Sequence, residues 1–343
     1  MKSFVVLRLS SMGDVLLTVP VIRGILASNP DIHLIFVTRQ RFCGYFTGIA
    51  RLTVIGFDPD KQHKGLIGIF RLYREISKHE FVSVIDLHGI LRTWILDGLF
   101  LLRGYRIFSI RKYRKERRAI ISHNKPGLTV PHTADRYQHV FLKAGLAGEI
   151  SETPLGDSDD SANLDTNKTG LKRIGIAPLS KHSTKNWGIS QVATLTELLR
   201  ASYDCEIHLF GGREDQELLD TLSAKDIFNH AGRISPTEEI SLIRTLQVFV
   251  SMDSANMHLA ALAGIPTVSV WGATDPKLGF APLYQPDDFA IYMDPSIITC
   301  RPCSVYGETP CKRADSPMIC MTSIKPEQVL NKITEILSST DKE

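Results

Sequence analysis

The sequence predicts an α/β protein built from two doubly wound parallel sheets. Short apolar segments rich in β-branched residues alternate with helical segments, and this alternation restarts after residue 170. The chain has 343 residues, more than one ordinary core accommodates, so two domains are expected. We place the domains and their connections at residues 1–155, 156–170 (linker), 171–325 and 326–343 (terminal helix and tail).

The first half begins with a strand over residues 3–9, which is short and β-branched and ends at a Ser-Ser-Met-Gly turn. Further strands are predicted at 32–38 and 81–86, with a helical stretch at 66–78. After the first strand, a helical stripe is formed by Val15, Val19, Ile22 and Leu26. Pro20 falls inside this stripe, so we expect a kink or an early turn there.

The second half repeats the pattern after a polar segment. Residues 151–170 are rich in Ser, Asp, Asn, Thr and Gly, which favours a linker. Strands are predicted at 173–177, 206–211, 247–251 and 266–271, and helices at 189–201, 213–224, 236–246, 256–263 and 326–338. Ligands of such sheets bind outside the carboxyl ends of the strands, so chemistry is expected in the strand-to-helix turns that face a cleft between the domains.

Charge is distributed unevenly along the chain. The net charge is +3, but residues 1–150 carry 23 Lys and Arg against 11 Asp and Glu, whereas residues 151–343 carry 17 against 26. The first half is therefore expected to meet an anionic partner, unless surface charge simply drifts between the domains. No apolar run reaches the roughly 18–20 residues of a membrane helix, and no cleavage site follows the first strand, so a cytoplasmic protein is expected.

The first strand-to-helix turn, Arg8 to Asp14, contains a candidate catalytic carboxylate. Gly13 lets the backbone turn sharply or approach a ligand. Asp14 follows at the start of a helix, where it could cap the helix or act as a general base. A helix N-terminus keeps the carboxylate ionised but makes it a weaker base. The turn lacks the G-x-G-x-x-G pattern of dinucleotide-binding proteins.

Two turns of the second half are suited to phosphate. The loop that contains Ser180, Thr184 and Lys185 offers hydroxyl groups and a cation, although a solvated loop has the same composition. In the segment 251–266, the turn Asp253-Ser254-Ala255 precedes a helix of small residues whose first N–H groups could bind diphosphate without a metal. Asp253 could hold a sugar hydroxyl. His258, one turn into the helix, is either a ligand or a packed core residue.

These motifs resemble glycosyltransferase family 9, whose best-known members are the ADP-heptose:lipopolysaccharide heptosyltransferases. The resemblance spans nearly the whole chain and is carried, in the family's order, by RLSSMGDVLLTVP, the KxW segment at 185–187 and DSANMHLAALAGIPTVSVWG. It implies the GT-B fold, in which one Rossmann-like domain binds the acceptor and the other the nucleotide-sugar. It also implies an inverting transfer from an ADP-sugar, without a catalytic metal or other required cofactor.

The resemblance assigns roles on the donor side and to the base. It implies that Asp14 is the catalytic base and that Lys185 contacts the donor diphosphate. Donor binding is expected at Ser180, Thr184, Lys185, Glu214, Asp253, Ser254, Ala255, Asn256 and His258. Ala255 stands where the family has Gly, which restricts the backbone and allows a different donor or pose. Glu214 is a loose match to the ribose-binding acid.

On the acceptor side, binding is expected at Ser10, Ser11, Gly13, His88, Arg92, Arg111 and Arg114. The last two belong to the run RKYRKERR over 111–118, which could hold the phosphates and carboxylates of an anionic glycolipid or the inner leaflet of the cytoplasmic membrane. A solvated basic loop is the alternative. The expected location is therefore peripheral, at the inner face of the inner membrane. Nucleic acid is not an expected partner.

Four cysteines near the C-terminus follow the pattern C-x₂-C-x₇-C-x₈-C and are Cys300, Cys303, Cys311 and Cys320. In a cytoplasmic chain four thiols suggest structural zinc before disulfides, but the spacing is not the paired C-x₂-C of a zinc ribbon. Free thiols are the alternative. Two other functions remain open for the whole chain: a sugar-nucleotide epimerase of the same architecture, and a binding protein of the same fold without activity.

Overall fold

The computed structural model describes residues 1–122, 127–156 and 170–340, and the chain divides into two compact units. The first unit holds Met1–Tyr113 and Pro131–Thr153, and the second holds Arg114–Val130 and Pro154–Glu343. Most of the predicted linker, residues 157–169, lies outside the described residues. Residues 114–130 pack with the second unit, although the predicted first domain, 1–155, contained them.

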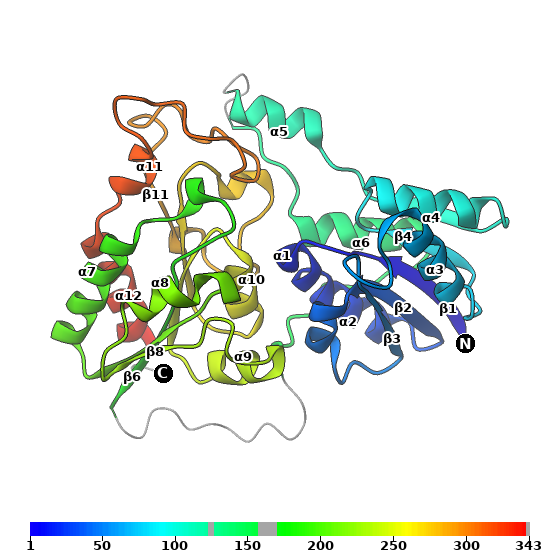
Figure 1. Cartoon of the computed structure of the whole chain (residues 1–343), viewed down its shortest axis with the longest axis horizontal. Coiled ribbons are helices and arrows are strands. Elements are labelled where there is room, and N and C mark those ends of the chain that lie inside the picture. The colour runs from blue at the N-terminus through cyan, green and yellow to red at the C-terminus, as the bar shows by residue number, and fades with distance from the viewer. Residues whose placement is uncertain (123–126, 157–169, 341–343) are drawn as a thin grey trace. The chain divides into compact units, whose positions relative to one another are not determined.

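The first unit contains a parallel five-stranded sheet in the order β3-β2-β1-β4-β5 (Figure 1). Its strands are β1 (Lys2–Leu7), β2 (Ile32–Arg39), β3 (Leu52–Phe57), β4 (Ser83–Asp86) and β5 (Arg106–Ser109). Leu7 pairs with Val37 on one side and with Asp86 on the other, which aligns the carboxyl ends of the three central strands. The three predicted strands are confirmed within two residues at each end. β3 and β5 were not predicted.

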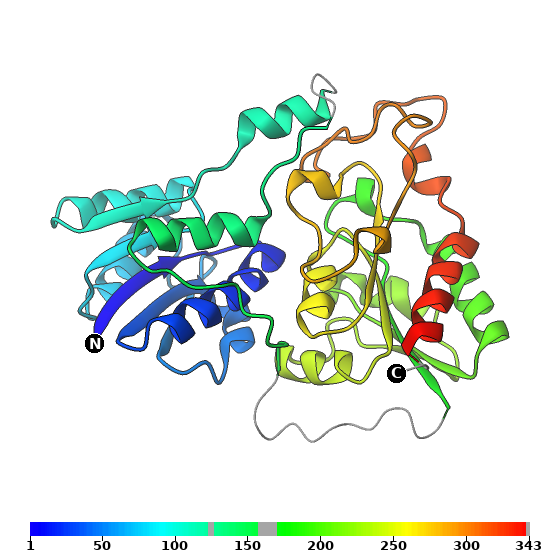
Figure 2. The ribbon, with the colours of Figure 1, turned by 180° about the vertical axis from the view of Figure 1, so that it is seen from behind.

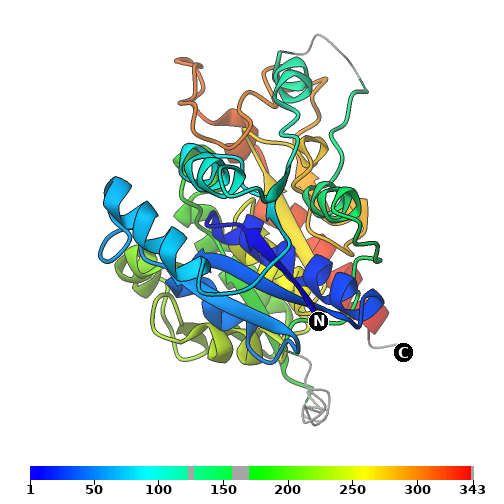
Figure 3. The same cartoon turned by 90° about the vertical axis from the view of Figure 1, so that its right-hand side faces the viewer.

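Helices cover both faces of this sheet, as a doubly wound fold requires. They are α1 (Met12–Leu16), α2 (Thr18–Ser28), α3 (Gly65–Ile76), α4 (Leu91–Leu101) and α6 (Thr133–Lys143), with the 3₁₀ turn η1 (Gln40–Phe46). α2 packs against α6, which Figure 2 shows in front of the sheet, and α3 packs against α4 on the opposite face (Figure 3). Pro20 is the third residue of α2, and the predicted single helix is interrupted at Leu17.

The second unit contains a parallel six-stranded sheet in the order β11-β10-β9-β6-β7-β8. The strands are β6 (Lys172–Ala177), β7 (Cys205–Leu209), β8 (Ile227–Asn229), β9 (Val248–Met252), β10 (Thr267–Trp271) and β11 (Ala290–Tyr292). The four predicted strands are β6, β7, β9 and β10, again within two residues at each end. β8 and β11 have three residues each, too short to give a sequence pattern.

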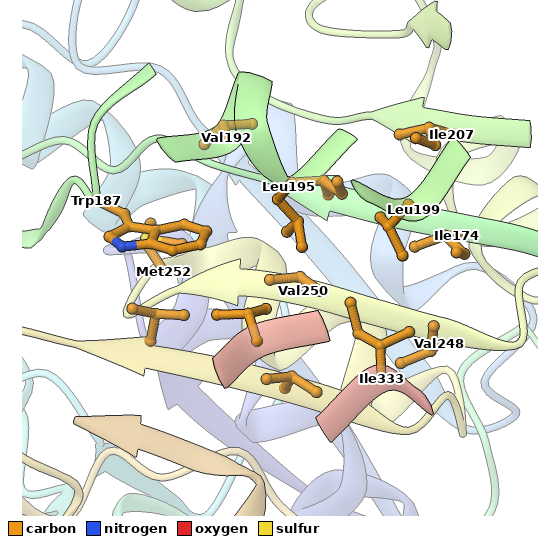
Figure 4. Packing of buried hydrophobic residues seen from close by; sticks show 14 of the residues in the cluster. Ile174, Trp187, Val192, Leu195, Leu199, Ile207, Val248, Val250, Met252 and Ile333 are labelled. Carbon is orange, nitrogen blue, oxygen red and sulfur yellow. The ribbon is translucent and has the colours of Figure 1, made fainter. Parts of the chain in front are cut away.

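The helices and 3₁₀ turns of the second unit are α5 (Arg114–Ile121), η2 (Ser183–Lys185), α7 (Ile189–Ser202), η3 (Arg213–Asp215), α8 (Gln216–Asp220), α9 (Pro236–Ile243), α10 (Ala255–Leu262), η4 (Pro276–Leu278), η5 (Asp287–Phe289), α11 (Ile319–Thr322) and α12 (Pro326–Thr340). The predicted helix 213–224 is shorter than expected and divides into η3 and α8. α12 packs against α7, and Figure 4 shows their apolar side chains over β6 and β9. The Trp187 indole anchors this core by donating to the Ile324 carbonyl at 3.0 Å.

The predicted basic run 111–118 is divided between the two units. Arg111 belongs to the first unit, whereas α5 begins at Arg114 in the second. Arg117 is 4% exposed because its guanidinium stacks 4.4 Å from the Phe280 ring and its Nε donates to the Leu278 carbonyl. This residue therefore fastens α5 to the second unit, and the run is not one solvated loop.

Each sheet has one point at which the strand order reverses. In the first unit the chain leaves β1 toward β2 on one side, and β4 lies on the other; in the second, β6 lies between β7 and β9. Loops that follow the two strands at such a point diverge to opposite faces and leave a crevice at the carboxyl ends. No helix among the described residues has the length and apolar character needed to cross a membrane.

Candidate active site

In the first unit, Asp14 lies in the turn after β1, at the point where the strand order reverses, and forms an ion pair. Asp14 is the third residue of α1, and the N-cap position is occupied by Ser11. Its Oδ2 lies 2.5 Å from Arg8 Nη2 and accepts a hydrogen bond from Ser11 Oγ at 2.8 Å. The Asp14 side chain is 24% exposed, so the carboxylate is held in place while a ligand can still reach it. Its backbone carbonyl also accepts a hydrogen bond from the Tyr137 hydroxyl.

Arg8 is the buried partner that sequence reasoning did not select. Its Nη1 donates to the Leu87 carbonyl at 2.8 Å, and its guanidinium lies 5.7 Å from the Tyr137 ring centroid. Burial lowers the pKa of Arg8, but the charge of Asp14 overcomes this effect and raises the pKa above its ordinary value. Arg8 therefore stays charged and favours the ionised carboxylate. Its position directly after β1, in the turn that leads to Asp14, was the available signal.

His88 lies in the loop after β4, where Asp86 shapes the backbone. Asp86 is fully buried and accepts hydrogen bonds from the amides of His88 and Gly89 and from the Thr93 hydroxyl. His88 is 6% exposed, and its Nδ1 has no hydrogen-bond partner among the described residues. Burial, followed by the charge of Arg8, lowers the pKa of His88 to about 2, so the ring is neutral at pH 7.

A second buried acid lies beneath this loop. Burial raises the pKa of Asp97 on α4 to about 8, and the neighbouring Asp86 adds to the effect. Asp97 therefore favours its neutral form near neutral pH, because a buried carboxyl group beside Asp86 is costly to ionise. Neither acid was selected from the sequence, although Asp86 at the end of an apolar strand was a visible signal.

The remaining acceptor candidates differ in their surroundings. Gly13 is buried, Ser10 is half-buried, and Ser11 is exposed at the start of α1. Arg92 is exposed in the first turn of α4, with its guanidinium 5.8 Å from the Phe57 ring centroid. Arg111 and Arg114 are both exposed but belong to different units, so the structure does not join them into one site within either unit.

In the second unit, the loops that follow β6 and β9 bring Lys185 and Asp253 together. Lys185 Nζ lies 3.2 Å from Asp253 Oδ2, and the two side chains are 13% and 10% exposed. The same Oδ2 accepts a hydrogen bond from Thr274 Oγ1 at 2.7 Å. The pair comes from loops 68 residues apart in the sequence, and its geometry places a cation beside a polar acceptor at the carboxyl edge.

The stem of Lys185 rests against Gly307. Two features favour glycine at position 307. A Cβ there would lie 2.7 Å from Lys185 Cγ, and the backbone has a φ of +85°, which other residues rarely adopt. Thr184 fixes the same contact, because its hydroxyl donates to the Gly307 carbonyl. The segment near Gly307 therefore helps to aim the ammonium group. Sequence reasoning missed it.

The start of α10 carries the predicted N–H groups. Ser254 occupies the N-cap position with extended backbone, and its hydroxyl lies 3.1 Å from that of Ser251. Ala255 and Asn256 are the first residues of the helix, where backbone N–H groups lack intrahelical partners. Ala255 has helical backbone, so its replacement of glycine causes no strain. His258 is 6% exposed, in keeping with a packed position.

The loop between Ser180 and Lys185 is held by its own hydrogen bonds. The Ser180 amide donates to Asn186 Oδ1 at 2.7 Å, and its hydroxyl donates to the His182 carbonyl. Burial, together with Lys185 and Lys181, lowers the pKa of His182. Glu214 is exposed in η3 after β7, where the neighbouring Asp215 accepts a hydrogen bond from the Gly212 amide.

Arg301 ties the loop after β10 to the same site. It is fully buried and donates to the carbonyls of Gly272, Met293 and Thr274 at 3.0–3.2 Å, with Asp275 Oδ2 3.4 Å from its Nη2. Because Thr274 in turn donates to Asp253, the guanidinium supports the Lys185–Asp253 pair through one intervening residue. Arg301 could not be predicted from the sequence, because nothing in its local pattern distinguishes it from a surface arginine.

The four C-terminal cysteines are free thiols. Burial raises the pKa of Cys320 to about 11 and also raises that of Cys303, which favours the protonated form. Among the residues that the structure describes, no three His, Cys, Asp or Glu side chains are arranged to hold a metal ion. The structure therefore gives no support to the predicted zinc site at Cys300, Cys303, Cys311 and Cys320.

Comparison with known sequences places these features in a family. Residues 69–307 match the model of glycosyltransferase family 9 (heptosyltransferase). The chain is 21% identical to the lipopolysaccharide core heptosyltransferase OpsX of Haemophilus influenzae, with 80% of each chain covered. It is also 21% identical to lipopolysaccharide heptosyltransferase 1 of Campylobacter coli, with 96% of this chain and 98% of that protein covered.

Solved structures show the same fold. A family 9 glycosyltransferase from Veillonella parvula has a TM-score of 0.74 at 20% identity, with 98% of both chains covered. The Escherichia coli heptosyltransferase WaaC with ADP has a TM-score of 0.68 at 18% identity, over 97% of this chain and 99% of that chain. The predicted architecture of two Rossmann-like domains, the GT-B fold, is thus confirmed.

Proposed function

The chain belongs to glycosyltransferase family 9, the heptosyltransferase family, and from this premise we propose its substrates and the residues that act on them. The donor is ADP-heptose or a related ADP-sugar, and the acceptor is the inner core of lipopolysaccharide or lipooligosaccharide. Relatives with these names and structures of WaaC with ADP and with ADP-2-deoxy-2-fluoro heptose support the proposal. We place the enzyme at the inner face of the inner membrane, because its acceptor is a glycolipid.

Asp14 is the general base of this proposal. It takes the proton of the acceptor hydroxyl as that oxygen forms a bond to the anomeric carbon, while the bond from this carbon to the diphosphate breaks on the opposite face. ADP leaves with the electron pair, and the configuration inverts. The observation that carries the assignment is a carboxylate that is fixed by Arg8 and Ser11 yet still accessible at the strand crossover point of the acceptor unit.

The ion pair with Arg8 makes Asp14 a weak base, but this reaction does not require a strong base. The transition state is oxocarbenium-like, as in glycoside hydrolysis, so the acceptor hydroxyl becomes strongly acidic while its bond to carbon forms. His88, whose ring is buried and neutral in the loop after β4, also belongs to the proposed acceptor site. Ser10, Ser11, Gly13, Arg92 and Arg111 complete the proposed acceptor site of the first unit.

The donor side stabilises the leaving group. Lys185 and the N–H groups at Ser254, Ala255 and Asn256 face the diphosphate as its negative charge grows, a role that preorganised donors fill without a metal. Asp253 accepts a hydrogen bond from a donor hydroxyl and aims Lys185. Ser180 and Thr184 line the same loop, Glu214 takes the ribose, and His258 packs behind the helix that carries the N–H groups.

The test is Asp14→Asn, measured with ADP-heptose and a heptose-free core acceptor. Turnover is expected to fall by roughly 10²–10⁴, with donor binding retained, because only the proton acceptor is lost. Asp135→Asn is the matched control: it removes an exposed acid from the same third position of α6, and transfer should persist. Near-normal transfer by the Asp14 variant would remove this residue from its role. Release of an epimerised sugar without acceptor would instead indicate an epimerase.

A further inference from the structure

The first unit carries an exposed apolar surface that the transfer reaction does not use. We propose that this surface, the docking face formed by Leu66, Ile67, Phe70, Leu91 and Trp94, seats the enzyme on an anionic lipid membrane. The inference rests on the proposed function in one respect, since the glycolipid acceptor of that function is presented by a membrane.

The α3 part of the docking face is apolar on a side that stays exposed among the described residues. Leu66, Ile67 and Phe70 are 65%, 77% and 51% exposed. On its inner side, α3 already buries Ile69 and Leu72 against the sheet. A helix at a water-facing surface normally keeps its outer side polar, so apolar residues on both sides indicate a second apolar contact.

The α4 part adds Leu91 and Trp94, which are 69% and 52% exposed. α3 and α4 pack side by side on one face of the sheet (Figure 3). Both helices follow strands that end at the carboxyl edge, β3 and β4, so their first turns lie at that edge. The docking face therefore borders the same edge as Asp14 and His88, and a membrane there would present its headgroups toward the acceptor site.

The charges around the docking face identify its partner. Lys64, Arg71, Arg74 and Arg92 are exposed on or beside the two helices. The acids of α3 and α4 are Glu75, whose carboxylate contacts His63, and Asp97, which is buried. Apolar side chains beside exposed cations suit an anionic bilayer surface. A second copy of the same face would bring like charges together, which disfavours a dimer through this surface.

Trp94 provides a direct reporter of docking. The chain has three tryptophans, and Trp187 and Trp271 are buried at 1% and 0% exposure. Adding vesicles of phosphatidylglycerol and phosphatidylethanolamine should shift the tryptophan emission to shorter wavelength, and brominated acyl chains should quench it. Trp94→Phe should abolish both responses. Vesicle binding with neither response would overturn the proposal.

A matched pair of variants tests the energetics by vesicle co-sedimentation. The double variant Ile67→Ser/Phe70→Ser should bind anionic vesicles about tenfold or more weakly, because two apolar side chains no longer enter the bilayer. Leu102→Ser is the control, since this leucine is 86% exposed but lies at the far end of α4, roughly 16 Å from Leu91. Raised salt, or neutral phosphatidylcholine alone, should also weaken binding of the unaltered protein.

Activity on two forms of the acceptor separates this inference from the proposed function. The double variant should transfer normally to a water-soluble, deacylated acceptor and lose transfer to the same acceptor in anionic vesicles. Absence of vesicle binding by the unaltered protein would overturn the docking proposal, as would equal loss in the control variant. The docking proposal would also be overturned if the unaltered protein self-associates and the double variant does not, because the face would then bind a second copy of the chain. If the unaltered protein transfers to neither form of the acceptor, the proposed function is contradicted. Vesicle co-sedimentation would then still test the docking proposal.

Discussion

The ion pair of Arg8 and Asp14 underlies the chemistry that we propose for the first unit. The Arg8 guanidinium is held by the Leu87 carbonyl and by Tyr137, which fixes it beside the carboxylate. In the proposed mechanism, protonation of Asp14 weakens this ion pair, which favours release of the proton after transfer. The same ion pair favours the ionised carboxylate that a general base requires.

Lys185 carries the corresponding prediction on the donor side. Lys185→Met keeps the apolar stem that packs on Gly307 but removes the charge, so kcat/KM is expected to fall by about 10²–10³ in a steady-state transfer assay. Lys181→Met, which removes an exposed lysine from the same loop, is the control and should leave the kinetics unchanged. Unchanged kinetics of Lys185→Met across the donor range would refute the role.

Asp97 predicts a pH dependence of stability. Its pKa is about 8 in the folded protein against an ordinary 3.8, so the folded state holds a proton that the unfolded state has lost. The stability that Asp97 contributes by holding this proton is therefore complete below about pH 4. It is lost progressively between about pH 4 and about pH 8, by at most about 1.4 kcal/mol per pH unit. Urea unfolding of Asp97→Asn should show a flatter dependence between pH 5 and 8. An unaltered slope would contradict the assignment.

At the scale of elements, three loops that follow adjacent strands build the proposed donor site. η2 after β6 supplies Lys185, the turn after β9 supplies Asp253, and the loop after β10 supplies Thr274. Arg301 comes from a later segment and stabilises the third loop by donating hydrogen bonds to the carbonyls of Gly272 and Thr274. The cation and the carboxylate are thus aligned by loops whose own positions depend on one buried guanidinium.

Thr274 tests this arrangement without unfolding the loop. Thr274→Val removes only the hydroxyl that donates to Asp253, so the KM for the donor should rise about 5–30-fold while the KM for the acceptor stays constant. Thr274→Ser keeps the hydroxyl and should restore donor binding. If the serine variant is as impaired as the valine variant, packing and not the hydrogen bond explains the loss.

At the scale of the molecule, we propose that each unit binds one substrate at its own strand crossover point, so the second unit should respond to the nucleotide alone. ADP at 100 times its Kd is expected to stabilise the folded protein by about 2.7 kcal/mol. A thermal-shift series should therefore rank ADP above UDP and GDP. Stabilisation by UDP or GDP that equals that by ADP would argue against an ADP-sugar donor.

The strands at the centre of each sheet could be predicted from their residues, because buried parallel strands are continuous apolar runs. The strands β3, β5, β8 and β11 could not, because they are the edge strands of the two sheets and have short or half-exposed patterns. Asp14, Lys185 and Asp253 were predictable because each follows a central strand and stands in a recognisable turn. Their supporting residues, Arg8, Thr274 and Arg301, were not.

Which distant residues meet could be seen only in the folded chain. Sequence patterns report local periodicity, whereas the Lys185–Asp253 and Arg301–Thr274 contacts join loops far apart in the chain. The structure also shows that α5 belongs to the second unit, where Arg117 is buried. It shows in addition that apolar side chains on the outer faces of α3 and α4 are exposed. Burial and pairing are properties of the folded chain, so the sequence determined the candidates for chemistry and the fold determined what surrounds them.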